Sequence, residues 1–336
     1  MNKQKSKVGA IAYGVALTGF TVWLALDTFV IPHVYEAVPA VTPILATAQA
    51  ETTPAAAQQT ASTRQNTKQR KTQQTAGKQK SKNQVVSEQI TVTAGDVIGQ
   101  YSQNGTQITL STARVLDSTV YVADVQLSDP AALTTVLAQN AYGRNVTETP
   151  SDMAQRTGAV LAVNGDYYGA RERGYVIRNG VVYRAVGSSG QQDLVIDANG
   201  DFSIILENEI SAEALAAQGA MQVLSFGPAL VEDGQVSVSG SAEVGQAMTS
   251  NPRTALAQVG PLHYLFVVAD GRTDESGGLT LNELAQYLQS LGAQTAYNLD
   301  GGGSSAMIFQ GQLVNSPTTT GRNAKERSVS DIVAIF

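Results

Sequence analysis

The residues best suited to chemistry lie at positions 298–305, in the order Asn298-Leu299-Asp300-Gly301-Gly302-Gly303-Ser304-Ser305. The apolar residues on either side of this stretch predict one strand before it and another after it. Glycine leaves the backbone free to adopt positive φ and lets another group approach it closely. We interpret the stretch as a carboxylate beside a row of N–H donors that can hold phosphate oxygens or an oxyanion. The alternative is a flexible glycine turn between two strands.

Two further acids stand beside a glycine at the end of a predicted strand. Asp166 lies in Asn164-Gly165-Asp166, directly after the apolar run 159–163, and Asp270 opens Asp270-Gly271-Arg272. Paired carboxylates are the usual equipment for cleaving a glycosidic bond through an oxocarbenium-like transition state. Asp270 by itself is equally consistent with a turn former.

The last third of the chain predicts a β-α-β crossover. A strand over 262–269 is followed by a helix that begins with the capping box Thr280-Leu281-Asn282-Glu283, and then by a strand over 295–299. Strands joined in this way should be parallel, with their carboxyl ends at the same edge of the sheet. We therefore expect Asp270 and Asp300 to share that edge, with Asp166 close by.

Arginine side chains are the second candidate group. Arg253 lies in Asn251-Pro252-Arg253-Thr254-Ala255, Arg272 follows Asp270, and Arg327 lies near the C-terminus. The planar guanidinium fork suits phosphate or carboxylate. For each arginine taken alone, the alternative is a surface residue or a structural ion pair.

The sequence gives less support to other kinds of catalytic or metal site. The chain has no cysteine, and His263, in the middle of a predicted strand, is the single histidine after residue 87. A Ser-His-Asp hydrolase and a zinc site are therefore disfavoured, and no lysine follows the glycines as a P-loop requires. No cofactor is required by the sequence. A hard-cation site for Ca²⁺ or Mg²⁺ built from Asp166, Asp270 and Asp300 is an alternative that the sequence does not demand.

The N-terminus predicts a membrane anchor. Lysines at positions 3, 5 and 7 precede a run without charge from residue 8 to residue 26, and residues 8–31 are long enough to span a bilayer as a helix. The lysines place residues 1–7 in the cytoplasm and the rest of the chain outside the cell membrane. A cleaved signal peptide is the alternative.

Residues 32–87 predict a basic, disordered linker, because large apolar side chains are nearly absent beyond residue 49. Its positive charge suits an anionic wall polymer, or else simply keeps a spacer extended. Residues 88–336 carry 12 basic and 25 acidic side chains, a net charge of −13. A domain this acidic is a poor candidate for binding nucleic acid.

For residues 88–336 we expect one mixed α/β domain with a partly parallel sheet, helical crossovers and β-hairpin extensions. Asn179-Gly180 between two apolar runs predicts a hairpin with a two-residue turn. Ser128-Asp129-Pro130, followed by apolar residues up to Asn140, predicts a helix.

Taken together, these motifs resemble the phosphodiester glycosidase family, which includes the lysosomal N-acetylglucosamine-1-phosphodiester α-N-acetylglucosaminidase and bacterial members often labelled exopolysaccharide biosynthesis proteins. The resemblance covers about residues 130–336. The motifs that carry it are Asn164-Gly165-Asp166-Tyr167-Tyr168, Gly227-Pro228, Asn251-Pro252-Arg253-Thr254-Ala255, Asp270-Gly271-Arg272, the stretch 298–305 and Arg327-Ser328-Val329.

The resemblance implies hydrolysis of a sugar-1-phosphodiester at the anomeric carbon, here in a glycopolymer of the bacterial envelope. We expect Asp300 to be a catalytic carboxylate with Asp270 as its partner and Asp166 nearby. Alternatives are a non-catalytic glycopolymer-binding protein and a phosphosugar transferase. The remaining candidates would bind phosphate or orient the sugar and the loop: Arg253, Arg272, Arg327, Asn164, Asn298, Gly301, Gly302, Gly303, Ser304 and Ser305.

Overall fold

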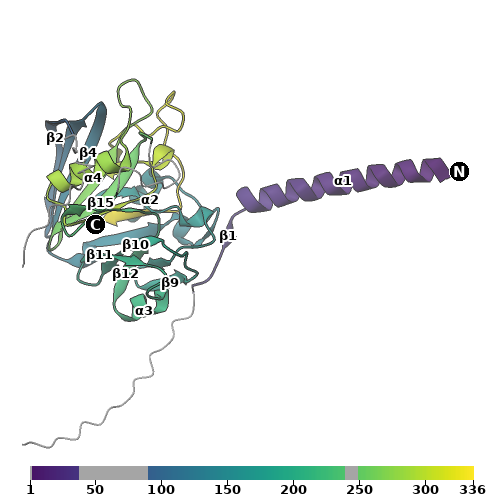
Figure 1. The fold of residues 1–336 in the computed structure, drawn as a ribbon, viewed down its shortest axis with the longest axis horizontal. Helices are drawn as coiled ribbons and strands as arrows, with labels where there is room; N and C mark the ends of the chain where they lie inside the picture. The colour runs from purple at the N-terminus through teal and green to yellow at the C-terminus, as the bar shows by residue number, and fades with distance from the viewer. Residues whose placement is uncertain (1, 38–89, 239–248) are drawn as a thin grey trace, which may run out of the picture. The chain divides into compact units, whose positions relative to one another are not determined.

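A computed structural model describes residues 2–37, 90–238 and 249–336, and most of the strands in these residues belong to three β-sheets (Figure 1). The largest sheet has eight strands in the order β14-β13-β17-β15-β16-β4-β3-β2. Their bounds, in chain order, are β2 (Val92–Gln103), β3 (Thr106–Val115), β4 (Ser118–Leu127), β13 (Ala229–Glu232), β14 (Gln235–Val236), β15 (Arg253–Gly260), β16 (His263–Ala269) and β17 (Thr295–Asn298).

The prediction of a partly parallel sheet is wrong, because every strand pair among the described residues is antiparallel. The crossover from β16 to β17 exists, but β15 lies between these two strands and pairs antiparallel with both. Only residues 261 and 262 separate β15 from β16, so the two strands form a hairpin and β15 occupies the place beside β16. Since both flanking strands oppose β15, they run in the same direction and end at the same edge of the sheet.

Two five-stranded sheets cover one side of the large sheet. The first has the order β19-β18-β7-β20-β5 and the second β11-β10-β12-β8-β9. Their bounds are β5 (Leu133–Leu137), β7 (Leu161–Asn164), β8 (Val176–Arg178), β9 (Val181–Arg184), β10 (Gln192–Asp197), β11 (Phe202–Leu206), β12 (Ala220–Leu224), β18 (Met307–Phe309), β19 (Gln312–Leu313) and β20 (Asp331–Ile335).

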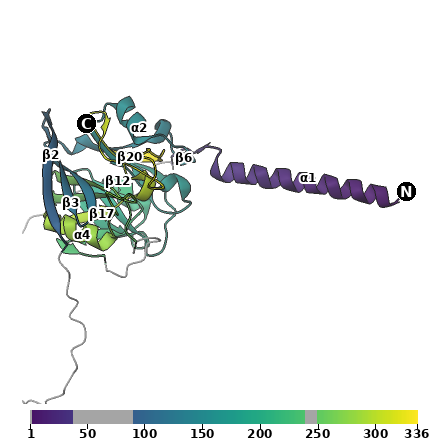
Figure 2. The same ribbon diagram turned by 90° about the horizontal axis from the view of Figure 1, so that it is seen from above.

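The main hydrophobic core lies between the large sheet and both smaller ones. Phe266 of β16 and Leu256 of β15 share this core with Leu161 of β7 and Leu194 of β10. Three helices complete the layers, each burying one apolar face on a sheet. α4 (Leu281–Ser290) packs on the other face of the large sheet, and α2 (Pro150–Thr157) packs on β7 and β20 (Figure 2). α3 (Ala212–Ala217) packs on β8, β9 and β12 (Figure 1).

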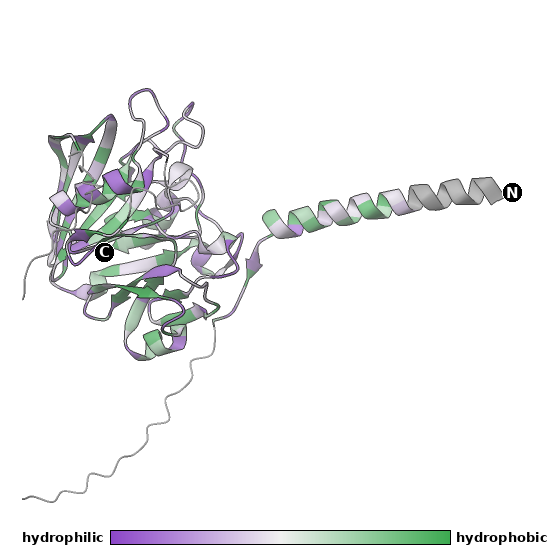
Figure 3. Cartoon of the chain, in the orientation of Figure 1, coloured by the Kyte–Doolittle hydropathy of each residue, from purple (hydrophilic) through white to green (hydrophobic). Residues whose placement is uncertain are grey.

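Several local predictions are confirmed. Thr280 and Glu283 form the expected capping box at the start of α4, whose hydrophobic and hydrophilic residues are visible side by side in Figure 3. Asn179 and Gly180 both have positive φ, at 54° and 77°, as a type I′ turn between β8 and β9 requires.

The predicted helix over 128–140 is wrong. Asp129 caps a single 3-10 turn at Pro130–Ala132, and the chain then enters β5, which pairs with β20. Thr134, Thr135 and Val136 are β-branched and favour this strand. The apolar spacing that suggested a helix face therefore reflects a strand buried in the sheet.

The N-terminal segment contains α1 (Asn2–Phe29) and the short strand β1 (His33–Val34), which pairs with β6 (Gly143–Arg144). Part of the predicted linker, at its beginning, is thus a strand, and residues 38–87 of that linker lie outside the described residues. Within the part of the chain that the structure describes, no helix is both long and apolar enough to cross a membrane. The predicted spanning helix over 8–31 is therefore not confirmed.

Candidate active site

Asp300 lies just after β17, where loops from two sheets meet. Its N–H donates to the carbonyl of Gly165 at 3.3 Å, and its carbonyl accepts from the Asn164 side-chain amide at 2.6 Å. The Asn164 Oδ1 accepts in turn from the Thr254 hydroxyl at 2.8 Å and from the Ala306 N–H at 3.2 Å. Asn164, fully buried, therefore orients the loop of Asp300, one of the two roles expected of it.

Burial and the neighbouring groups act on the pKa of the Asp300 carboxyl group in opposite directions. Burial raises its pKa, whereas the Ser304 hydroxyl, the Arg327 charge, the Gly301 N–H and the Arg171 charge lower it. Burial disfavours the charged form of an acid and neighbouring cations favour it. A carboxyl group whose pKa is raised toward the working pH can exchange a proton during a reaction.

The glycine stretch forms a compact 3-10 turn at Gly302–Ser304. The N–H of Gly302 donates to the Pro252 carbonyl at 2.8 Å, while the N–H groups of Ser304 and Ser305 donate to the carbonyls of Gly301 and Gly302, each at 3.2 Å. Three of the N–H groups expected to bind anionic oxygens thus already bond to the backbone. The tight turn instead holds the loop firmly against the start of β15.

Two glycines of this loop are needed for close approach. Gly302 has a φ of 62°, and a Cβ there would lie 2.9 Å from Arg272 Nη2. A Cβ on Gly303 would lie 2.3 Å from the Thr319 hydroxyl. Glycine at these positions therefore lets a guanidinium and a hydroxyl lie directly on the backbone.

Asp270 follows β16 at the same sheet edge and is buried. Its Oδ1 accepts from the Asn315 side-chain amide at 2.9 Å, and the Ser316 N–H lies 3.1 and 3.2 Å from its two oxygens. Burial raises the pKa of Asp270, and these donors together with Tyr121 lower it. Asn315 also donates to the Ser305 carbonyl at 3.0 Å and so joins Asp270 to the loop of Asp300.

Asp166 lies in the loop after β7, next to that of Asp300, but its oxygens face the interior. Oδ1 pairs with Arg178 at 2.8 Å, and Oδ2 accepts from the Ser225 N–H at 2.7 Å. Arg178 also pairs with Asp331 at 2.8 Å, and all three charged side chains are almost completely buried. This geometry gives Asp166 a supporting role. An arginine that directly follows the apolar residues of β8 was the signal in the sequence for such a buried pair.

Arg253 is also an interior residue. Its Nε donates to the Leu279 carbonyl and its Nη2 to the Thr249 carbonyl, both at 2.8 Å. Burial, and then the Arg272 charge, lower the pKa of Arg253 to about 10. The structure thus places Arg253 at the shared sheet edge, where it fixes backbone carbonyls.

Arg272 and Arg327 converge on Thr319. Arg272 Nη1 donates to the Thr319 carbonyl at 2.9 Å, and Arg327 Nη2 donates to the Thr319 hydroxyl at 3.5 Å. Arg272 is further fixed by Asn251 Oδ1, 3.2 Å from Nε and 3.0 Å from Nη2. The sequence contained both arginines, but nothing in it pointed to Thr319.

Asn298 lies at the end of β17 and is buried. Its side-chain amide donates to the Gly227 carbonyl at 2.8 Å, and the Gly227 N–H donates back to the Asn298 carbonyl at 3.2 Å. The predicted motifs Gly227-Pro228 and 298–305 are thus neighbours in space.

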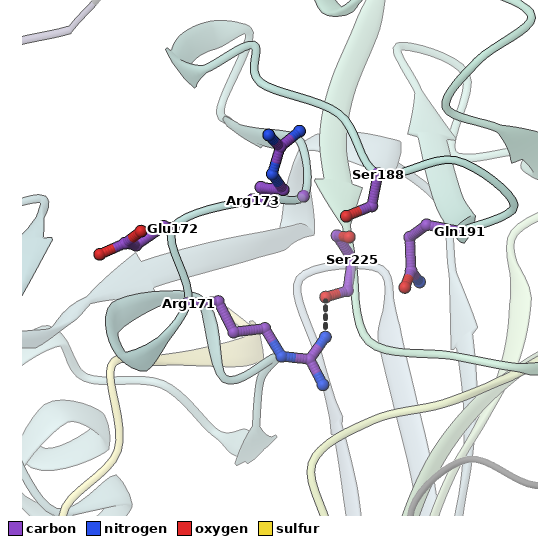
Figure 4. A pocket seen from close by; sticks show the side chains of 7 residues that line it. Arg171, Glu172, Arg173, Ser188, Gln191 and Ser225 are labelled. Atoms are coloured by element: carbon purple, nitrogen blue, oxygen red, sulfur yellow. Dashed lines mark hydrogen bonds between the residues drawn. The ribbon is translucent and has the colours of Figure 1, made fainter.

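Two cavities adjoin this constellation. The first, of about 440 Å³, is lined by Arg272, Ser316 and Thr318, among others, and therefore borders the surroundings of both Asp270 and Gly302. The second, of about 490 Å³, is lined by Arg171, Glu172, Arg173, Gly174, Ser188, Gln191 and Ser225 (Figure 4).

Arg171 is the functional candidate that the sequence analysis missed. Its Nη1 donates to the Ser225 carbonyl at 3.3 Å, and its Cζ lies 4.7 Å from the centre of the Phe226 ring. Stacking on an aromatic ring and one carbonyl bond hold a guanidinium in place while leaving other N–H donors for a ligand. Since its charge also lowers the pKa of Asp300, Arg171 links the second cavity to that carboxyl group.

No three His, Cys, Asp or Glu side chains within the described ranges are grouped so that they could hold a metal ion. The alternative built from Asp166, Asp270 and Asp300 gains no support, because the oxygens of Asp166 already face Arg178 and Ser225.

Two known proteins are similar to this chain in sequence. An uncharacterised SPbeta prophage-derived protein of Bacillus subtilis, YomE, is 29% identical over 201 residues, which are 58% of this chain and 30% of that protein. The mouse N-acetylglucosamine-1-phosphodiester α-N-acetylglucosaminidase is 26% identical over 218 residues, 57% of this chain and 40% of the enzyme. The chain thus spans less than half the length of each of these relatives.

Among solved structures, the catalytic domain of the zebrafish N-acetylglucosamine-1-phosphodiester α-N-acetylglucosaminidase, auto-inhibited by its pro-peptide, has a similar fold. The TM-score is 0.55 at 19% sequence identity, covering 74% of this chain and 88% of that one. The family model of the phosphodiester glycosidases matches residues 157–336, more than half of the sequence. The chain therefore belongs to the phosphodiester glycosidase family.

Proposed function

We propose that this protein hydrolyses a sugar-1-phosphodiester by breaking the bond between the anomeric carbon and the phosphate oxygen. The proposal rests on Asp300, which lies at a sheet edge. Burial raises the pKa of its carboxyl group, and the charges of Arg171 and Arg327 lower it. A carboxylate beside cations suits a substrate that joins a sugar to a phosphate.

Each side chain has a distinct task in this reaction. Asp300 supplies the carboxylate at the anomeric carbon, either as nucleophile or as base toward water. Arg272 and Arg327, brought together by Thr319, bind the phosphate oxygens. As the carbon–oxygen bond breaks, the electron pair passes to the phosphate, which leaves as a monoester. Such a leaving group needs little protonation, so a strong general acid is not required.

Asp270 supports the site from the same edge. Its bonds to Asn315 and Ser316 connect it to the loop of Asp300 and to the wall of the 440 Å³ cavity. We propose a glycopolymer outside the cell as the source of the phosphodiester, on the strength of the family relationship and the predicted orientation of the N-terminus.

The test is turnover of a chromogenic sugar-1-phosphodiester by the full chain. Release of free sugar and a phosphomonoester supports the proposal, and the anomer formed first separates a nucleophilic Asp300 from a base. Binding without turnover would instead identify a glycopolymer-binding protein. Transfer of the sugar to an added alcohol, in preference to water, would identify a transferase. Asp233→Asn, in an exposed turn between β13 and β14, is the matched control for Asp300→Asn.

A further inference from the structure

Two buried acids, Asp193 and Glu207, lie behind the cavity of Arg171. Asp193 belongs to β10 and is completely buried, and Glu207 follows β11 and is 3% exposed. Their strands are paired, and the Glu207 N–H donates to the Gln191 carbonyl at 3.1 Å. Neither acid takes part in the reaction described above, so their burial calls for another explanation.

Glu207 accepts three hydrogen bonds, as an ionised carboxylate can. Its Oε1 accepts from the Tyr175 N–H at 2.6 Å and from the Ser225 hydroxyl at 3.0 Å, and its Oε2 accepts a short bond from the Ser188 N–H. Ser188 and Ser225 both line the cavity, and Ser225 also accepts from Arg171 through its carbonyl. Glu207 thus fixes two elements of the cavity wall and, through Ser225, the position of the guanidinium.

Asp193 differs from Glu207 in its hydrogen bonds. Within the described residues, neither of its oxygens accepts a hydrogen bond. Burial, and then the charge of Glu207, raise the pKa of Asp193 to about 10. Arg178, a buried cation that pairs with Asp166, is held between Asp166 and Asp331. The Ser225 hydroxyl favours the charged form of Asp193, but it already donates to Glu207 at 3.0 Å, so an ionised carboxylate in this place would be buried with too few donors, which is costly.

We propose that Asp193 keeps its proton in the folded protein and uses it to donate a hydrogen bond to Glu207, and that this acid pair is a positioning unit for ligand binding in the cavity of Arg171. The proton gives Asp193 a donor and gives Glu207 a further partner, so the two buried acids carry one negative charge between them. The second half of the proposal rests on the proposed function, since it takes this cavity to hold an anionic group of the substrate.

The protonation has a direct thermodynamic consequence. Asp193 has a folded-state pKa near 10 against an ordinary value of 3.8, so the native state binds a proton that the unfolded state releases. Stability from this group is fully present below about pH 4 and decreases as the pH rises toward 10. The ionisable and polar groups that act on Asp193, or on which it acts, are Glu207, Asp166, Ser225, Tyr175 and Tyr297.

The first experiment measures protonation without any assay of activity. Carbon-13 NMR of protein labelled at the aspartate carboxyl carbons, with Asp193→Asn to assign the signal, should show Asp193 as a neutral acid at pH 7 that does not titrate between pH 4 and pH 8. A signal that titrates near the ordinary value would overturn the proposal. Because turnover is not involved, this result stands or falls independently of the proposed function.

The second experiment uses the matched pair Asp193→Asn and Glu207→Gln. An asparagine amide can donate to Glu207 as the protonated acid does, so Asp193→Asn should be as stable as the wild type below about pH 4 and more stable at pH 8. Glu207→Gln replaces one acceptor oxygen by an NH₂ group and must lose the bond from Ser188 or those from Tyr175 and Ser225. A larger loss of stability for Asp193→Asn than for Glu207→Gln at pH 8 would contradict the proposal.

The positioning role is measured by calorimetric titration with inorganic phosphate, with the wild-type reference and every variant also carrying Arg272→Gln and Arg327→Gln, so that the phosphate site of the proposed function is removed and the cavity of Arg171 is left. Loss of one well-placed hydrogen bond corresponds to roughly a tenfold change in Kd. We expect Glu207→Gln to bind phosphate about tenfold more weakly, while Asp193→Asn retains the wild-type Kd. Equal Kd values for Glu207→Gln and the wild type, or no phosphate binding by the wild type, would refute the positioning role.

Discussion

The side-chain amide of Asn164 donates a hydrogen bond of 2.6 Å to the backbone carbonyl of Asp300, 136 residues further along the chain. This contact joins the end of β7 in one sheet to the end of β17 in another. The candidate active site is therefore built on an inter-sheet contact, and the position of Asp300 depends on a residue that needs no contact with substrate.

Asn164→Ala should lower both stability and activity. The substitution leaves the Thr254 hydroxyl, the Ala306 N–H and the Asp300 carbonyl without their partner, and each unsatisfied buried group costs about 1–3 kcal/mol. Denaturant unfolding measures the loss. Asn199→Ala, at an exposed turn, should change the free energy of unfolding little, and an equally small effect for Asn164→Ala would show that the contact is unimportant.

Asp300→Asn should reduce turnover of a sugar-1-phosphodiester by about 10²-fold or more, equivalent to about 3 kcal/mol of transition-state stabilisation. The substitution keeps the side-chain shape and removes the charge that the reaction needs. Stability should be retained. Because burial raises the pKa of Asp300, the native state takes up a proton here, so stability falls as the pH rises through that pKa, and the variant should lose this dependence. A stable variant with normal turnover would rule out the catalytic role.

Arg327→Gln should move the acidic limb of the kcat/KM profile to higher pH. The Arg327 charge lowers the pKa of Asp300, so its removal lets burial raise that pKa further. Arg171→Gln should act in the same direction. Arg173→Gln is the matched control, because Arg173 lines the same cavity as Arg171 but is not among the charges that act on Asp300. A limb that is unchanged in both Arg327→Gln and Arg171→Gln would disprove this electrostatic coupling.

Arg178→Met should destabilise the protein by about 3–5 kcal/mol, because it leaves two buried acids, Asp166 and Asp331, without their cation. Arg156→Met breaks a partly exposed pair with Glu148 and should cost about 0.2–1 kcal/mol. Thermal unfolding of both variants gives the comparison. Equal losses would mean that the buried pair contributes no more than a surface pair.

The sequence by itself determined the local features of the fold. The capping box at Thr280 and the turn at Asn179-Gly180 are both present, because each depends on a few neighbouring residues. The family was also recognisable, because its motifs are short and occur together in order along the chain.

Strand pairing was decided only by the tertiary structure. β15 lies between β16 and β17, so the expected parallel pair became two antiparallel pairs that nevertheless end at one edge. The pattern of apolar residues tells which segments are buried, but it does not tell which segment lies beside which. For the same reason, residues 133–137 became a strand paired with β20.

The tertiary structure likewise divided the candidate residues between chemistry and support. Asp166 and Asp300 both follow an apolar strand, yet Asp166 faces Arg178, and Asp300 lies where the charges of Arg171 and Arg327 reach it. The local sequence pattern shows only that an acidic residue follows an apolar strand. Its role depends on burial and on the partners that remote segments bring to it, and these are properties of the folded chain.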